Sequence, residues 1–156
     1  MRIYVTIAIM LIFVVLPQSV FAQVVVQTQS LRVGNIYQTG SGGAVVKIEA
    51  DGTVSQGSNQ LAAPITARNG TYQVTGIAGN VDISVTNITS CSASATVDGF
   101  AALWNGTGYA DISTTPIAAA AFDGNEILSL GVRISYGAGV SLGNCFVSFD
   151  LNVNYS

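Results

Sequence analysis

Few side chains in this sequence have types and spacings that could carry out acid–base or nucleophilic chemistry. None of the 156 residues is histidine, the side chain that most often exchanges protons near neutral pH. The acidic residues occur singly, and those in turn signals such as Asp51-Gly52 and Asp123-Gly124 serve the backbone of the turn. The sequence therefore indicates a protein that is not an enzyme, with no cofactor, no metal site and no evident small-molecule substrate.

The two cysteines, Cys91 and Cys145, are the pair for which a covalent bond is predicted. An even number of cysteines in an exported chain indicates a disulfide, and without histidine or a C-x-x-C spacing the pair does not fit a metal or redox site. The two positions are 54 residues apart (145 − 91). Closing a loop of that length stabilises the folded state by about 4 kcal/mol in the chain-entropy description.

The N-terminus predicts export. A short basic start is followed by an apolar run over residues 3–16 and by a small-residue cleavage site that ends at Ala22, the pattern of a secretory signal peptide. An uncleaved membrane anchor is the alternative, but the run is short for a span and Pro17 follows it. Cleavage would leave 134 residues (156 − 22), the size of a single domain over residues 23–156.

Charge is scarce in the predicted mature part. It carries four basic and eight acidic residues, a net charge of −4 (4 − 8), and no basic patch. This composition argues against nucleic acid or anionic lipid as a partner. Gly, Ser, Thr, Asn and Val dominate instead, which is typical of β-structure with many turns.

Alternation of apolar and polar residues predicts eight or nine short strands and no convincing helix. The strands are expected over residues 23–33, 44–50, 53–56, 60–67, 71–77, 81–86, 118–122, 126–136 and 143–156. Turn signals that contain glycine separate several of them, at 51–52, 69–70, 105–106 and 123–125. This pattern predicts an all-β fold, an antiparallel β-sandwich.

The last predicted strand has the cleanest alternation. Its apolar positions are Cys145, Val147, Phe149, Leu151, Val153 and Tyr155. Polar residues lie between nearly all of them, so the strand is expected to have one dry and one wet face. A chain that ends on such a strand leaves two alternatives for its open side. The strand is either the last core strand of a complete secreted sandwich or an edge that pairs with a strand of another chain.

The first predicted strand changes its alternation near Ser30. The residues on one face before that point are Val24, Val26 and Thr28. Leu31 and Val33 have the other parity, which predicts a bulge or a kink. Such a kink could separate a free arm, residues 23–30, from the domain. An ordinary first strand with a frayed start is the alternative that the local pattern favours.

Two aromatic residues in the middle of the chain, Trp104 and Tyr109, could line a sugar-binding surface, because aromatic faces stack on the apolar faces of sugars. Packing of both side chains in the core is the favoured alternative.

Several segments resemble known bacterial secreted proteins. The alternating run that ends at penultimate Tyr155, with Gly143 fourteenth from the end, is similar to the C-terminal β-zipper of pilus subunits assembled by the chaperone–usher route. The L-R-V-G segment at 31–34, the Gly-rich run at 42–53, the Y-x-V-T-G segment at 72–76 and the closing V-N-Y are similar to the family known as "domain of unknown function 4402". The likeness covers nearly the whole predicted mature chain.

This resemblance implies an incomplete immunoglobulin-like sandwich with a groove beside the last strand. A periplasmic chaperone would fill the groove first, an outer-membrane usher would assemble the subunits, and the arm of the next like subunit would then replace the chaperone. The donor residues would be Val24, Val26 and Thr28, and the residues along the groove would be Phe149, Leu151, Val153 and Tyr155. The expected function is that of a structural or minor subunit of a fibre at the cell surface.

Two alternatives to a fibre subunit are considered. The first is a self-complete secreted sandwich that binds a glycan or a protein. The second is an eight-stranded outer-membrane barrel, whose last strand also alternates. The barrel fits less well, because its aromatic residue is normally the very last one and this chain ends in Ser156.

Overall fold

The computed structural model of the chain describes residues 23–38, 42–56, 61–62, 67–138 and 141–156. The predicted signal peptide, residues 1–22, lies outside the described residues, as does most of the strand predicted over 60–67. The described residues form strands and no helix, and every strand pair is antiparallel. The predicted all-β antiparallel sandwich is therefore confirmed.

The strands belong to four sheets. The five-stranded sheet has the order β1 (Val24–Gln29), β6 (Gly70–Thr75), β12 (Asn125–Leu130), β9 (Ala102–Trp104) and β10 (Thr107–Tyr109). The four-stranded sheet has the order β4 (Val54–Gln56), β3 (Ala44–Ile48), β13 (Val132–Tyr136) and β8 (Ala95–Gly99). One three-stranded sheet contains β11 (Ile117–Phe122), β7 (Gly79–Thr89) and β15 (Ser148–Tyr155), and the other contains β14 (Ser141–Cys145), β2 (Gly34–Gln38) and β5 (Leu61–Ala62).

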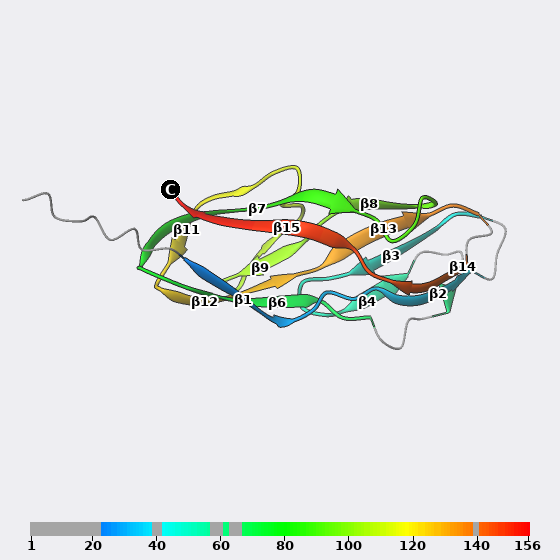
Figure 1. Cartoon of the computed structure of the whole chain (residues 1–156), viewed down its shortest axis with the longest axis horizontal. Coiled ribbons are helices and arrows are strands. Elements are labelled where there is room, and N and C mark those ends of the chain that lie inside the picture. The colour runs from blue at the N-terminus through cyan, green and yellow to red at the C-terminus, as the bar shows by residue number, and fades with distance from the viewer. Residues whose placement is uncertain (1–22, 39–41, 57–60, 63–66, 139–140) are drawn as a thin grey trace, which may run out of the picture.

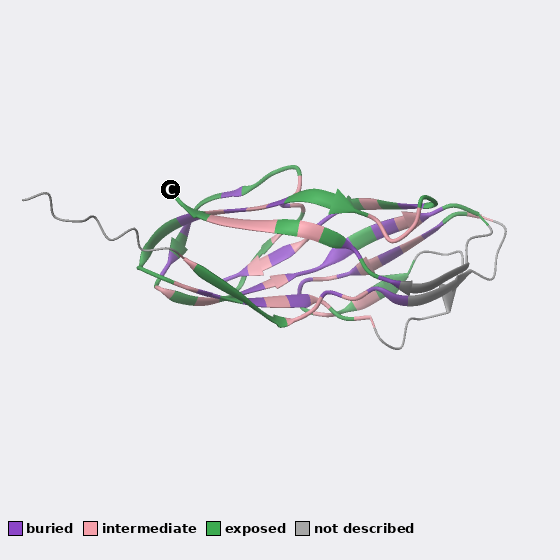
Figure 2. Cartoon of the chain, viewed as in Figure 1, coloured by how far each residue is buried: buried purple, intermediate pink, exposed green. Residues whose placement is uncertain are grey.

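All four sheets contribute to one hydrophobic core. In Figure 1, β7, β8 and β15 run along one long side of the molecule, and β1, β6 and β12 run along the other. Alternate residues of the strands point between these layers, which gives the interrupted buried bands of Figure 2. Val74 of β6, Ile83 of β7 and Ile134 of β13 are fully buried in this core. Complete burial of each such side chain stabilises the fold by roughly 1.5–3 kcal/mol.

The strand predicted over residues 126–136 is two strands that belong to different sheets. Glycine 131 separates β12 from β13, and a side chain at Gly131 would lie 2.1 Å from the carbonyl oxygen of Ile48. Its amide donates to the carbonyl of Ala101 at 2.8 Å. The single-strand prediction was wrong because Leu130 and Val132 both point into the shared core, so the alternation continues through the break.

The terminal strand is also divided. β14 ends at Cys145 and β15 begins at Ser148, with exposed Phe146 and buried Val147 between them. The start of this strand was predicted too late, at position 143, because β14 already begins at Ser141. The odd-numbered positions nevertheless stay apolar across the interruption, which explains why the sequence predicts one continuous strand.

The kink predicted near Ser30 is present. β1 joins the five-stranded sheet and β2 joins another, and the β1–β6 register shifts between Gln27 and Gln29. The Asn105-Gly106 turn is confirmed as the β9–β10 hairpin, with φ of 49° and 75° at its two central residues. The turn predicted at 69–70 was wrong, because Gly70 is the first residue of β6.

Candidate functional site

The last strand, β15, lies at the edge of its sheet. It pairs along its length with β7, from Ser148 opposite Thr89 to Tyr155 opposite Val81. Among the described residues, no strand pairs with its other side. An edge strand presents a row of unpaired backbone N–H and C=O groups, which is a template for pairing with another chain.

The inward-facing side chains of β15 are less buried than those of its neighbour. Phe149, Leu151 and Val153 are half-buried against the core, and Tyr155 is 41% exposed. The β7 partners of Leu151, Val153 and Tyr155 are fully buried, and they are Val85, Ile83 and Val81. Because paired residues of the two strands share a face, the difference comes from the open flank of β15.

The segment predicted as a free arm is an edge strand of its own domain. β1 pairs with β6 from Val24 opposite Thr75 to Gln29 opposite Thr71. This corrects the free-arm hypothesis in favour of the ordinary first strand. The side chains of residues 24–28 are exposed, with Val24 at 52%, Val25 at 38% and Val26 at 51%. β1 is therefore held on β6 chiefly by backbone hydrogen bonds.

Side chains add a few polar contacts between β1 and the edge of β6. The hydroxyls of Thr28 and Thr71 lie 2.8 Å apart. The amide of Gln27 donates to the hydroxyl of Tyr72 at 3.3 Å, and the amide of Gln29 donates to the backbone oxygen of Asn69 at 2.9 Å. Burial raises the pKa of Tyr72 above its usual value, and the hydrogen bond from Gln27 opposes part of that shift.

β1 and β15 are edge strands of two sheets that pack against each other, since the ring of Tyr72 on β6 contacts that of Phe149 on β15. We call the region between these two edges the β1–β15 seam, and we define it by inward-facing residues of the two strands: Val25, Gln27, Phe149, Leu151 and Val153. In its middle, the ring of Phe149 lies 6.4 Å from that of Tyr72 and 4.8 Å from that of Phe100. The two strands are not paired with each other in the part of the chain that the structure describes.

Contacts close the seam at both ends. At one end, the Tyr155 hydroxyl accepts from the Ile77 amide at 2.6 Å and donates to the Ile77 carbonyl at 3.1 Å. A methyl group at Gly76 would lie 2.5 Å from that hydroxyl and 3.3 Å from Cγ of Gln23. At the other end, the guanidinium of Arg32 lies 5.5 Å from the centre of the Phe146 ring.

The disulfide anchors the chain just before β15. Cys91 and Cys145 are the predicted pair, and their sulfurs lie 2.03 Å apart. Cys145 is fully buried, and its sulfur lies 3.6 Å from the hydroxyl of Tyr136. Burial raises the pKa of Tyr136 well above its usual range. The bridge fixes the entry to β15 against the connection between β7 and β8.

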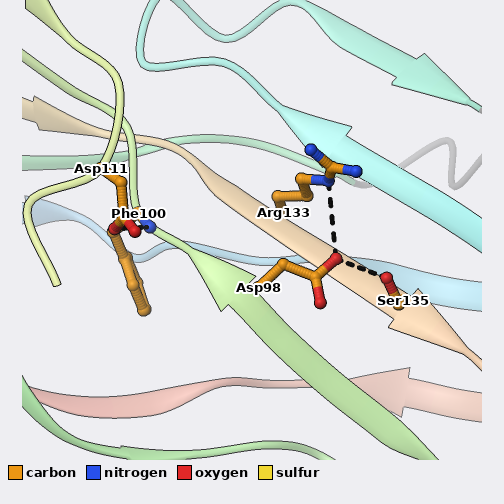
Figure 3. Close-up of polar contacts among 5 residues, drawn as sticks. All are labelled: Asp98, Phe100, Asp111, Arg133 and Ser135. Atoms are coloured by element: carbon orange, nitrogen blue, oxygen red, sulfur yellow. Dashed lines mark hydrogen bonds and ion pairs between the residues drawn. The ribbon is translucent and has the colours of Figure 1, made fainter. Parts of the chain in front are cut away.

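A second group of polar contacts involves the carboxylates of Asp98 and Asp111 (Figure 3). Asp98 accepts a short hydrogen bond from Ser135 and pairs with Arg133 at 3.5 Å. Asp111 accepts from the amide of Phe100 at 3.1 Å and from the hydroxyl of Ser113 at 2.6 Å.

Partial burial opposes ionisation of Asp111, but hydrogen bonds from Ser113, Phe100 and Thr114 outweigh it and lower the pKa of Asp111 to about 2. A carboxylate that stays ionised and fully hydrogen-bonded holds a turn and is a poor proton acceptor. Within the described residues, no group of three or more metal-binding side chains occurs.

The two aromatic residues considered for sugar binding have different environments. Trp104 is 2% exposed, and its ring nitrogen donates to the carbonyl of Ala121 at 3.0 Å, so it belongs to the core. Tyr109 is half-buried and lines a cleft of about 440 Å³ together with Lys47, Glu49 and Asp51.

Sequence reasoning missed the residues that contact the predicted residues of β15 and the contact that closes the other end of the seam. Gly76 and Tyr72 lie in a segment that the family resemblance used, but nothing in the local pattern places them beside β15 or β1. The contact between Arg32 and Phe146 joins positions more than a hundred residues apart, and no local signal marks it.

Within the described residues, no helix is long and apolar enough to cross a membrane. No protein-family model, no curated protein and no solved structure matches the chain.

Proposed function

We propose that the chain is a non-enzymatic structural or minor subunit of a bacterial surface fibre, assembled by β-strand addition between subunits. The observation that carries this proposal is the state of β15. Its inner face is apolar but only half-buried, while Val81, Ile83 and Val85 on the same face of neighbouring β7 are fully buried. An added strand along the seam would cover Leu151 and Val153 and would pair with the open backbone of β15.

The proposed donor is β1. Its residues Val24, Val26 and Thr28 alternate, and the two valines are about half exposed while the strand is docked. A strand held chiefly by backbone hydrogen bonds loses little side-chain burial when it leaves. A head-to-tail exchange of this kind does not close on itself, so it produces a fibre.

Export is part of the same proposal. The signal peptide is removed after Ala22, the disulfide forms in the periplasm, and the subunit then reaches the cell surface. A periplasmic chaperone and an outer-membrane usher are the partners that the resemblance to pilus subunits suggests. Like subunits are the partners in the finished fibre.

Deletion of β1 tests the proposal. The full-length gene is expressed with its signal peptide, beside a variant that lacks residues 23–30, and surface extracts are run on denaturing gels without boiling. The intact protein is expected to give a ladder of oligomers, and the deletion variant is expected to give none. A ladder that survives the deletion would refute strand donation by β1.

A matched control keeps the donor strand and removes another exposed apolar side chain. Ile127 on β12 is 63% exposed, and it lies outward on the same sheet as β1. Ile127→Thr is expected to leave the ladder unchanged. If this variant also loses the ladder, general surface hydrophobicity holds the oligomers together, and the seam does not.

A second candidate function is glycan or protein binding by a self-complete sandwich. The cleft beside Tyr109 favours it, because an aromatic ring there is flanked by the charged groups of Lys47, Glu49 and Asp51. Under this alternative the secreted protein is monomeric, and Tyr109→Ala abolishes retention on a glycan array while the protein stays folded.

A further inference from the structure

We propose that Gln23 is a modification site, at which the mature chain closes its first residue into a pyroglutamate lactam and expels a buried amide nitrogen that the fold leaves without a partner. Cleavage after Ala22 makes Gln23 the first residue and frees its α-amino group. The inference therefore rests on the export step of the proposed function. It concerns the covalent chemistry of the mature N-terminus and does not depend on how subunits pair.

The side chain of Gln23 lies in a small space over Gly76. Gln23 directly precedes β1 and extends that strand beyond the end of the β1–β6 ladder. Its Cγ would lie 3.3 Å from a methyl group at Gly76, and the same methyl group would lie 2.5 Å from the hydroxyl of Tyr155 and 3.4 Å from the ring of Phe122. Figure 1 shows the start of β1 and the C-terminus at the same end of the molecule. Three side chains thus converge over a position that has none.

The amide group of Gln23 is unfavourably placed in this space. Its Nε2 is buried, and within the described residues it has no hydrogen-bond partner. The hydroxyl of Tyr155, which lies over the same glycine, is bonded to the backbone amide and carbonyl of Ile77. A buried N–H group without an acceptor has lost its hydrogen bonds to water and gained none, which raises the free energy of the folded chain. Loss of Nε2 would remove that cost.

Ring closure removes this atom and no other heavy atom. The unprotonated α-amino nitrogen attacks Cδ of its own side chain, so a bond from that nitrogen to Cδ forms and the bond from Cδ to Nε2 breaks. Nε2 leaves as ammonia and takes the proton that the attacking amine gives up. The step needs no oxidant, reductant or second reactant. The usual pKa of an α-amino group is about 7.7–8.0, so part of it is unprotonated at neutral pH.

Mass spectrometry of the exported protein tests the lactam. The full-length gene is expressed with its signal peptide, and the periplasmic protein is purified and incubated at neutral pH. Its intact mass is then measured, and its N-terminal peptide is sequenced by fragmentation. The expected mass is that of residues 23–156 with the disulfide, less one ammonia, and the loss is expected at the first residue of the N-terminal peptide.

The matched control is Gln23→Asn. This side chain keeps an amide but is one methylene shorter, so the same attack would have to form a strained four-membered ring. The variant is expected to keep its ammonia at the first residue. If the variant loses ammonia there as well, the reaction does not depend on the glutamine side chain and the lactam is overturned.

The position of the first residue separates this inference from the proposal on which it rests. A mature chain that begins at Gln23 and keeps its ammonia would overturn the lactam and leave the export proposal standing. A chain that begins at any other residue would overturn both the lactam and cleavage after Ala22. Neither result would bear on strand addition at β15.

A second measurement tests the role of the fold. The closed form lacks the positive charge of the free amine, so ion exchange separates it from the open form. In the unfolded chain the amide of Gln23 is hydrated, and only the folded open form leaves Nε2 without a partner. The closed form is therefore expected to unfold at a higher urea concentration than the open form. An equal or lower midpoint for the closed form would overturn the part of the proposal that assigns the buried nitrogen a cost.

Discussion

Removing the disulfide by Cys91→Ala and Cys145→Ala together is expected to destabilise the fold by about 4 kcal/mol. The bridge closes a loop over 54 positions. Its loss frees about 14 cal/mol/K of unfolded-chain entropy, or about 4 kcal/mol at room temperature. A domain of this size has roughly 5–15 kcal/mol of total stability, so the variant loses a large part of it.

Denaturant unfolding measures this change, and Trp104 provides the signal. The indole is 2% exposed in the folded chain, so its fluorescence reports exposure on unfolding. We expect the urea midpoint to fall, the slope to rise because the unfolded chain is less compact without the bridge, and the unfolding temperature to fall by roughly 10–20 °C. Reduction of the unmodified protein should give a loss of similar size.

The double variant also supplies the control, because it has no sulfur for a reductant to act on. A reductant should therefore lower the stability of the unmodified protein and leave the variant unchanged. A loss below about 1 kcal/mol would refute the entropy reasoning and would mean that the unfolded chain stays compact without the bridge. An effect of the reductant on both proteins would mean that it acts on something other than the disulfide.

Three further changes test the packing and the polar contacts. Gly131→Ala should cost about 2–3 kcal/mol in thermal unfolding, because the new methyl would lie 2.1 Å from the carbonyl oxygen of Ile48, and a cost near zero would contradict the clash. Tyr155→Phe removes two hydrogen bonds to the backbone of Ile77, and should cost about 1 kcal/mol and speed hydrogen exchange of that amide. The pKa of Asp111 is lowered from 3.8 to about 2 in the fold, so its contribution to stability is present above pH 3.8 and is lost as pH falls through 2. Asp111→Asn should flatten the pH dependence of the urea midpoint in that window, and an unchanged pH profile would assign the acid sensitivity to other carboxylates.

Local patterns predicted much of the fold. Alternation identified β3, β6 and β7 because each has one buried face. Successive side chains of a strand point to opposite faces, so a few residues of sequence are enough to show this pattern. Glycine identified the turn between β9 and β10, since its positive φ is a local property, but neither strand was predicted. The pairing of Cys91 with Cys145 was predicted from their even number and from the expected export of the chain.

The assignment of strands to sheets had no local signal. Alternation shows which face of a strand is apolar, and in a sandwich the apolar faces of both layers pack in the same core. The chain could therefore change sheets at Gly131 without any change of parity, and the break became visible through the contact of that glycine with Ile48.

The seam shows the same division between local and long-range information. The alternation in residues 143–156 predicts a strand with one apolar face, and such a face is expected to pack against other apolar groups. What covers it is a matter of pairing between distant segments, and pairing depends on backbone edges that any sequence presents alike. Tertiary structure therefore decided that β1 docks on β6 and that β15 keeps an open flank, because those outcomes follow from which edges meet in space.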